Sequence, residues 1–321
     1  MVKILTSHHK IWNIEKITIS IIKEYLDNGR VVICLNNEGP CASSIGLYSL
    51  LDDICEKFNF SKKNIIIETC NFEETHSDYV IIKLKQHWIN STVNSFNQLE
   101  FEYQKNVTKN LFGCLYNVPS WDRLCLLSYI YFHTKNPSML FCNGIWEGSK
   151  YNSYYLNDLV DFYPDQIFTV VDYLKTFPAG LLGDLTNGNK PVSIEDMLKV
   201  IPNYNDFFID LVAETYTQGL SFFITEKTLR PILTLTPFII QAPKSFLSTL
   251  KSDYGILTFD KWWDESYDNY DGSARIERIF KLIDYIDKFT INDRLEIYKE
   301  MQPTLSHNFK QLQTYVQKTN R

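Results

Sequence analysis

Along the first 85 residues, hydrophobic positions alternate between two kinds of spacing. Short runs of consecutive apolar residues are typical of buried strands, whereas apolar residues that recur every three or four positions are typical of helices. The runs lie at residues 2–6, 31–35, 64–68 and 79–82, and the helical spacing lies at residues 14–26 and 44–58. This order predicts a parallel sheet with helices on its faces.

The alternation fades at about residues 86–109, where polar residues crowd, and then resumes. We expect a strand at 110–115 and, after it, a helix that Ser120 caps. Residues 134–205 contain Pro and Gly at intervals, which indicates loops with short helices. The later elements expected are a strand ending at Ala213, a short strand at 221–224, a helix from 225–227 that is closed by the apolar run 236–240, and helices at 276–286 and 305–316.

Length and composition suit a protein with two hydrophobic cores, since the chain has 321 residues and 45% of them are apolar. We therefore predict an α/β fold of two Rossmann-like domains with a helical C-terminus. The expected parts are a first domain at residues 1–105, a second at 106–290, and C-terminal helices at 291–321 that pack back toward the first domain.

Charge and cysteine content narrow the classes of partner. A formal net charge of −6 argues against a protein whose main task is to hold nucleic acid. The seven cysteines include no CxxC pair, so neither a disulfide framework nor a zinc site is indicated. The sequence shows no signal-peptide core and no long uncharged apolar run, so we expect a cytoplasmic protein without a membrane anchor.

Polar side chains gather where the strand ending at Ala213 gives way to the next helix. Glu214 ends the strand, and the first helical turns contain Thr225, Glu226, Lys227 and Arg230. A helix start favours phosphate, a carboxylate accepts hydrogen bonds from a ribose diol, and Lys and Arg offset the charge of a diphosphate. The alternative is an ordinary helix start in which Lys and Arg are solvated and Glu214 pairs with a nearby cation.

This junction also resembles a known family. The string FFITEKTLRPILTLTPFII, followed by LKSDYGILTFDKWWDESYDNYDGSARIERI, is similar to the C-terminal half of GT-B-like glycosyltransferases from phages, large viruses and marine bacteria. That group is similar in turn to the nucleotide-sugar domains of exostosin-type and α-1,3-fucosyltransferase enzymes. The resemblance implies two Rossmann-like domains that face each other across a cleft. It also implies transfer of a sugar from a nucleotide sugar to a hydroxyl acceptor such as a glycan, in the host cytoplasm if the protein is viral.

The resemblance covers residues 212–279 and is weaker around LFGCLYNVPSWDRLCLL. There, Asn117 and Arg123 follow the first strand of the second domain and would form the other edge of the donor cleft, where Arg can bind phosphate with two hydrogen bonds. Related sequences often have an Arg-rich turn at this point, whereas this chain has VPSWDR. Arg123 is therefore read either as part of the donor site or as one half of an Asp122–Arg123 pair at a surface helix start.

An inverting transfer needs a base that takes the proton of the acceptor hydroxyl, and loops after the strands of the first domain offer candidates. His8 and His9 follow the first strand, and Glu38 follows the second. A further group follows the third strand: Glu73, Glu74 and His76. A retaining transfer can proceed without a protein base, so the stereochemistry stays open.

The acidic aromatic segment at residues 260–268 combines rings that stack on sugars with carboxylates that bind hydroxyls. Asp264 and Glu265 are its candidates for a ligand contact, although packing under the last helices is the favoured reading. The chain has no EF-hand pattern and no DxD signature. We therefore expect no metal and no cofactor, with the nucleotide sugar as co-substrate.

Two other classes of function stay open. A viral DNA-modifying sugar transferase that acts on a hydroxylated base would need a basic groove, which only the segment 86–109, together with the lysines just before it, could begin. The residues that would contribute to it are Lys83, Lys85, His87, Trp88 and Lys105. A non-catalytic nucleotide- or glycan-binding module is the other, since a fold alone does not establish activity. A phosphate-loop NTPase is excluded because no GxxxxGK[ST] motif occurs.

Overall fold

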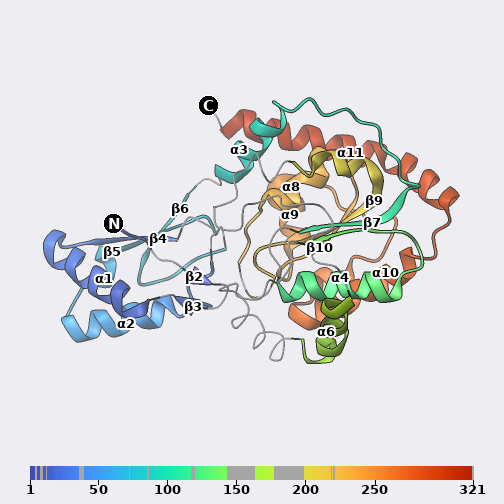
Figure 1. The fold of residues 1–321 in the computed structure, drawn as a ribbon. Coiled ribbons are helices and arrows are strands. Elements are labelled where there is room, and N and C mark those ends of the chain that lie inside the picture. Colours follow the sequence, from blue (N-terminus) through green and yellow to red (C-terminus); the bar gives the residue numbers. More distant parts are fainter. Residues whose placement is uncertain are drawn as a thin grey trace. The chain divides into compact units, whose positions relative to one another are not determined.

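The protein forms two compact units in the computed structural model (Figure 1). Unit 1 comprises Met1–His87 together with Gln218–Phe223, and unit 2 comprises Trp88–Thr217 and Ile224–Arg321. The structure describes residues 1–3, 6–7, 10–11, 13–35, 40–71, 73–84, 87–116, 120–142, 163–176, 199–217, 219 and 221–319.

Unit 1 is built on a parallel sheet with the strand order β1-β4-β5-β6. Its strands are β1 (Val2–Lys3), β4 (Val31–Leu35), β5 (Ile65–Thr69) and β6 (Val80–Lys83), and a separate antiparallel pair consists of β2 (Thr6–Ser7) and β3 (Lys10–Ile11). Its helices are α1 (Ile14–Asn28), α2 (Leu47–Phe58) and the short 3₁₀ helix η1 (Lys62–Asn64). The predicted parallel sheet with helices is confirmed for this unit.

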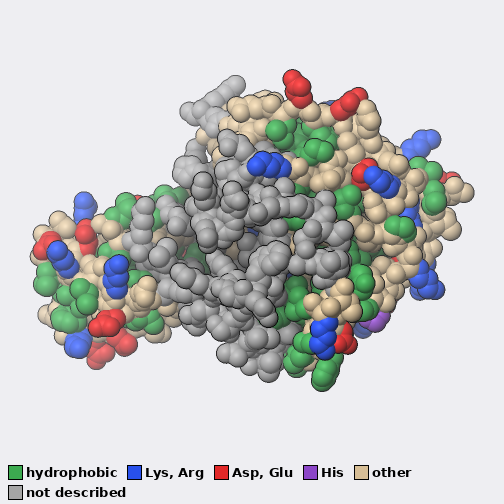
Figure 2. Space-filling view, in the orientation of Figure 1, with side chains coloured by type: hydrophobic (Ala, Val, Ile, Leu, Met, Phe, Trp, Pro, Cys, Tyr) green, Lys and Arg blue, Asp and Glu red, His purple; other side chains and the backbone are tan. Residues whose placement is uncertain are grey.

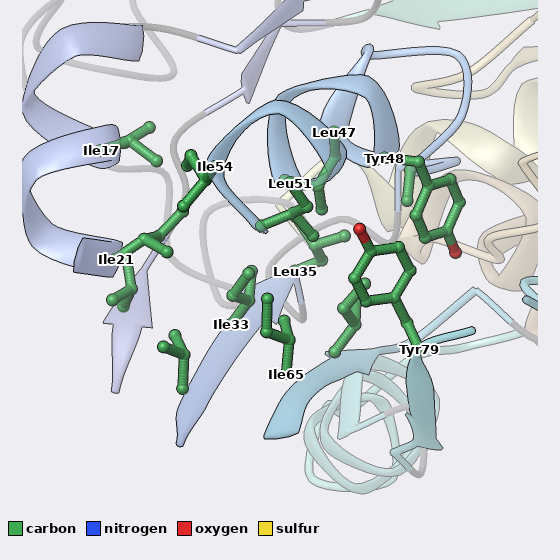
Figure 3. Packing of buried hydrophobic residues seen from close by; sticks show 14 of the residues in the cluster. Ile17, Ile21, Ile33, Leu35, Leu47, Tyr48, Leu51, Ile54, Ile65 and Tyr79 are labelled. Atoms are coloured by element: carbon green, nitrogen blue, oxygen red, sulfur yellow. The ribbon is translucent and has the colours of Figure 1, made fainter. Parts of the chain in front are cut away.

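The core of unit 1 lies between this sheet and its two helices (Figure 3). Ile17 and Ile21 of α1, spaced one helical turn apart, are buried with Ile33 of β4. The sequence predicts amphipathic helices here, and α1 and α2 each bury one face as expected. Gly29 ends α1 in the left-handed region, with φ 66°, and donates to Tyr25 O at 2.7 Å.

The segment Gln218–Phe223, here called the returning segment, joins unit 1 although its neighbours in sequence belong to unit 2. Cys41 N donates to Ser221 Oγ at 2.8 Å, and Phe222 N donates to Asn71 Oδ1 at 3.3 Å. The prediction of a strand at 221–224 is wrong, since these residues are buried but join no ladder. A short apolar run satisfies burial in irregular backbone as well as in a strand, and periodicity does not separate the two.

Unit 2 contains a second parallel sheet, with the order β10-β9-β7-β8. Its strands are β7 (Asn110–Tyr116), β8 (Met139–Cys142), β9 (Phe207–Ala213) and β10 (Phe238–Gln241). The helices are α3 (His87–Phe96), α4 (Trp121–His133), α6 (Ile167–Thr176), α8 (Glu226–Leu233), α9 (Phe246–Tyr254), α10 (Gly272–Ile286) and α11 (Ile291–Thr319), with 3₁₀ turns η2 (Pro164–Gln166), η3 (Ile201–Asp206) and η4 (Ser266–Asn269). The expectation that the helix from 225–227 closes with the run 236–240 is wrong, since α8 ends at Leu233 and Phe238–Gln241 form β10.

Helices cover both faces of this sheet, with α4, α6 and α10 on one side and α8, α9 and α11 on the other (Figure 1). The chain passes from β7 through α4 to β8, and later returns to the opposite side of β7 to form β9 and β10. The strand order thus reverses between β7 and β9. In open parallel sheets, ligands bind outside the carboxyl ends of the strands at such a reversal.

Residues 88–105, which the sequence analysis assigned to the first domain, lie in unit 2. Asn97 exchanges two hydrogen bonds with Gln313 of α11, and Thr319 Oγ1 donates to Asn90 Oδ1. The roles given to the predicted domains stay predictions. None of the helices that the structure describes combines the length and apolar character needed to span a bilayer.

Candidate functional site

Glu214, just past β9, holds the start of α8. Its carboxylate accepts hydrogen bonds from Thr225 Oγ1 at 2.6 Å, Thr225 N at 3.2 Å and Thr228 Oγ1 at 2.5 Å. Thr225 caps the helix, since its Oγ1 accepts from Lys227 N at 3.2 Å. Glu214 is 2% exposed, and its negative charge lies at the positive end of α8. The carboxylate of Glu214 therefore takes the place at the helix start where a phosphate was expected.

Lys227 is the most exposed of the charged side chains at this junction, at 15%. Its Nζ donates to Thr225 Oγ1 at 2.9 Å and to Thr215 Oγ1 at 3.2 Å, and it lies 3.5 Å from Glu226 Oε1. The two threonine hydroxyls position the ammonium group, and the carboxylate of Glu214, whose Oε2 lies 3.9 Å away, pairs with it as in the alternative reading of this junction. Because it is more exposed than Glu214, Glu226 and Arg230, Lys227 is the charged group of this junction that an anionic ligand from solution reaches most easily.

Glu226 lies in the first turn of α8 between two cations. Its Oε1 is 3.5 Å from Lys227 Nζ and 3.6 Å from an Arg230 guanidinium nitrogen. Burial alone would raise the pKa of Glu226, but the charges of Lys227, Arg230 and Arg123 lower it below its usual value. Glu226 is thus an ionised acceptor at neutral pH.

Arg230 is buried one turn further along α8, so it is not the solvated residue of an ordinary helix start. Its Nε donates to Glu226 O at 3.3 Å. Burial would lower the pKa of Arg230, but Tyr204, Glu226, Asp210 and Glu214 raise it. Its guanidinium group is positioned to hold Glu226, whereas the sequence analysis expected it to bind a diphosphate directly.

Arg123 joins the site from the other side of the strand reversal. Ser120 caps α4 as predicted, since its side chain accepts from Arg123 N. An Arg123 guanidinium nitrogen donates to Ala213 O at 3.3 Å, at the end of β9. Asp122 accepts from Gln241 Nε2 at 3.0 Å and from the Tyr163 hydroxyl. Asp122 and Arg123 are both buried, so the surface-pair reading is wrong.

A group of hydrogen-bonded titratable side chains in unit 2 was not predicted from the sequence. Asp210, in the middle of β9, accepts from the Tyr204 hydroxyl at 2.7 Å, and burial raises its pKa to about 7. Lys105 Nζ donates to Tyr204 O at 2.5 Å and to Thr236 Oγ1 at 2.7 Å, and burial lowers its pKa to about 7. The signal in the sequence is an aspartate inside the apolar run FFIDLVA. Lys105 is engaged internally and does not contribute to a basic groove.

The structure describes three of the six candidates for the base that takes the acceptor proton: Glu73, Glu74 and His76. His8, His9 and Glu38, like Asn117 of the donor set, lie outside the described residues. Glu74 is buried and accepts from Ala42 N and the Tyr48 hydroxyl, each at 2.7 Å, which is a structural role. His76 Nδ1 accepts from Asp78 N at 3.1 Å, so its neutral ring carries the proton on Nε2 and offers a donor there. Glu73 is exposed.

The segment at residues 260–268 serves the packing of unit 2. Asp264 accepts from Ser266 N at 2.8 Å, and Glu265 Oε1 accepts from Phe259 N at 2.9 Å. Burial raises the pKa of Glu265 to about 7. Asp268 accepts from two N–H groups at the start of α9 and pairs with the fully buried Arg275 at 3.1 Å. These contacts favour the structural reading of the segment.

Charge on the surface is mixed. On the face shown in Figure 2, the Lys and Arg side chains of the described residues are scattered rather than gathered in one patch. Among the described residues, no group of three or more His, Cys, Asp and Glu side chains could hold a metal ion. No protein-family model, no curated protein and no solved structure matches the chain.

Proposed function

We propose that unit 2 binds the nucleotide-sugar donor of a glycosyltransferase at the carboxyl edge of its sheet. The observation that carries the proposal is the convergence of Glu226, Lys227 and Arg123 beside the reversal between β7 and β9. This is the edge at which open α/β sheets bind nucleotides. The site thus combines an ionised acceptor with two cations.

Each residue has a defined task in this proposal. Glu226 accepts hydrogen bonds from the ribose diol, while Lys227 and Arg123 offset the diphosphate charge that grows as the bond to the sugar breaks. Glu214 and Arg230 hold these groups in place. In the transfer, the acceptor oxygen bonds to the anomeric carbon, and the nucleoside diphosphate leaves with the electron pair of the broken bond. The acceptor proton passes to a base, for which His8, His9 and Glu38 stay the candidates.

Unit 1 is proposed to carry the acceptor, in a GT-B-like arrangement that needs no metal. A non-catalytic binding module would share the donor site but would neither transfer nor hydrolyse the sugar, so release of sugar from the bound donor separates the two. The DNA-modifying alternative loses support because Lys105 is bound inside unit 2.

A thermal-unfolding screen against UDP, GDP, CMP, ADP and dTDP, with and without Mg²⁺, tests the donor site. A nucleotide at about 100 times its dissociation constant adds roughly 2.7 kcal/mol to the free energy of unfolding, which reads as a few degrees. We expect one nucleotide to shift the midpoint without Mg²⁺ and Lys227→Ala to abolish most of the shift. The control is Lys251→Ala, on the exposed side of α9. No shift by any nucleotide would remove the proposal.

A further inference from the structure

Gln241, the last residue of β10, is a polar side chain in an otherwise apolar strand. It is fully buried, and its Nε2 donates to Asp122 Oδ1 at 3.0 Å. A carboxylate only accepts hydrogen bonds, so the amide nitrogen must face Asp122 and the carbonyl oxygen is turned away from it. Within the described part of the chain, Gln241 Oε1 has no hydrogen-bond partner.

A buried oxygen without a hydrogen-bond donor lowers the stability of the fold. A buried acceptor without a donor keeps its full desolvation penalty, and native proteins leave few of them unmatched. An apolar residue like the other three of β10 would avoid the penalty. The contact with Asp122 accounts for the Nε2 group of Gln241, whereas the unmatched Oε1 is free to accept from a donor that comes from outside the chain.

Gln241 is adjacent to the donor site. Its backbone oxygen accepts from Glu214 N at 2.9 Å, and it pairs in register with Ala213. Ala213 O in turn anchors the guanidinium group of Arg123. The amide of Gln241 thus lies one strand away from the residues proposed to meet the diphosphate.

We propose that Gln241 and Asp122 form the subsite for the sugar of the donor, and that this sugar is neutral. The inference rests on the proposed function, because it assigns the group attached to the diphosphate. Both side chains offer acceptors, which match the hydroxyls of a neutral sugar, whereas the carboxylate of a uronic or sialic acid would be repelled by Asp122. Because Gln241 is fully buried in the free protein, the sugar displaces side chains that cover the end of β10 when it binds.

Isothermal titration with matched ligands tests the subsite. If uracil is the base selected, the ligands are UDP, UDP-glucose and UDP-glucuronate; if guanine is, they are GDP, GDP-mannose and GDP-mannuronate. We expect the wild type to bind the neutral sugar nucleotide about 10-fold or more tightly than the acidic one. Gln241→Met should weaken the neutral sugar nucleotide by about 3- to 10-fold, the factor for one lost hydrogen bond, and leave the nucleoside diphosphate unchanged.

The control is Gln302→Met on α11, which loses a hydrogen bond to Tyr298 O elsewhere in unit 2 and should leave all three affinities unchanged. Equal affinity of the wild type for the neutral and acidic sugars overturns the subsite. So does an equal loss for diphosphate and sugar nucleotide in Gln241→Met, while the donor site itself would stand. If Gln241→Met does not fold, the wild-type comparison decides. A folded wild type that binds no nucleotide removes the donor site and the subsite together.

Discussion

Glu214→Gln tests whether one carboxylate holds the start of α8. In the native protein, Glu214 Oε1 accepts from Thr225 N and Thr228 Oγ1, and Oε2 accepts from Thr225 Oγ1. Glutamine preserves the shape but has a single acceptor oxygen. Its NH₂ group must therefore face a donor on one side, and the negative charge that lies 3.9 Å from Lys227 Nζ is lost.

The magnitude follows from these contacts. Losing one hydrogen bond to a charged group costs about 1.5–3 kcal/mol. A threonine hydroxyl can rotate and turn a lone pair toward the new NH₂ group, which recovers part of that cost. We therefore expect the free energy of unfolding of unit 2 to fall by about 2 kcal/mol. For a unit of this size, the midpoint of thermal unfolding should fall by roughly 4–8 °C.

Urea unfolding at pH 7, followed by tryptophan fluorescence, measures the change. Trp121, Trp262 and Trp263 lie in unit 2 and report on it. Glu296→Gln, on the exposed face of α11, is the control for loss of a carboxylate charge and should leave the midpoint in place. A loss below about 0.5 kcal/mol for Glu214→Gln, which is within the usual range for a surface substitution, would refute the reasoning.

Two further predictions concern the interior of unit 2. Gly113→Ala should destabilise the protein by about 1–3 kcal/mol, because a Cβ there would lie 2.5 Å from Phe207 Cζ. When Phe207→Leu is added to Gly113→Ala, urea unfolding should show that part of the lost stability returns. Burial raises the pKa of Asp210 from 3.8 to about 7, so the folded protein keeps a proton that the unfolded chain releases, and this carboxyl makes stability fall as pH rises from 3.8 to 7. In Asp210→Asn, unfolding measured at pH 5 and pH 7 should show less of that fall, and an unchanged pH dependence would contradict the assignment.

The sequence was sufficient where local chemistry determines the structure. The helix start at Thr225, the cap at Ser120 and the parallel strands follow from patterns that act within a few residues. The strand predicted at 221–224 is absent, and Ser221 and Phe222 instead form hydrogen bonds with Cys41 and Asn71, which are distant in sequence. The spacing of hydrophobic residues within a short segment does not predict contacts between distant segments.

In the candidate site, too, the sequence predicts the local features but not those that depend on distant contacts. Glu214, Glu226 and Lys227 lie close together, as expected of residues that flank one strand-to-helix junction, while their role in donor binding stays a prediction. The burial of Arg230 and the pairing of Asp122 with Gln241 were not predicted, because they depend on which strands are neighbours. The order β10-β9-β7-β8 decides this, and a single sequence does not specify it.

The discontinuity of unit 1 has a consequence for synthesis. Domains generally fold as units during translation, the N-terminal one first. Here the N-terminal unit lacks Gln218–Phe223 until the ribosome has made more than half of unit 2, so Cys41 N and Phe222 N meet their partners late. During synthesis, unit 1 therefore stays incomplete until residues 218–223 have been translated. A gene fragment that ends at His87 would leave it permanently in that state.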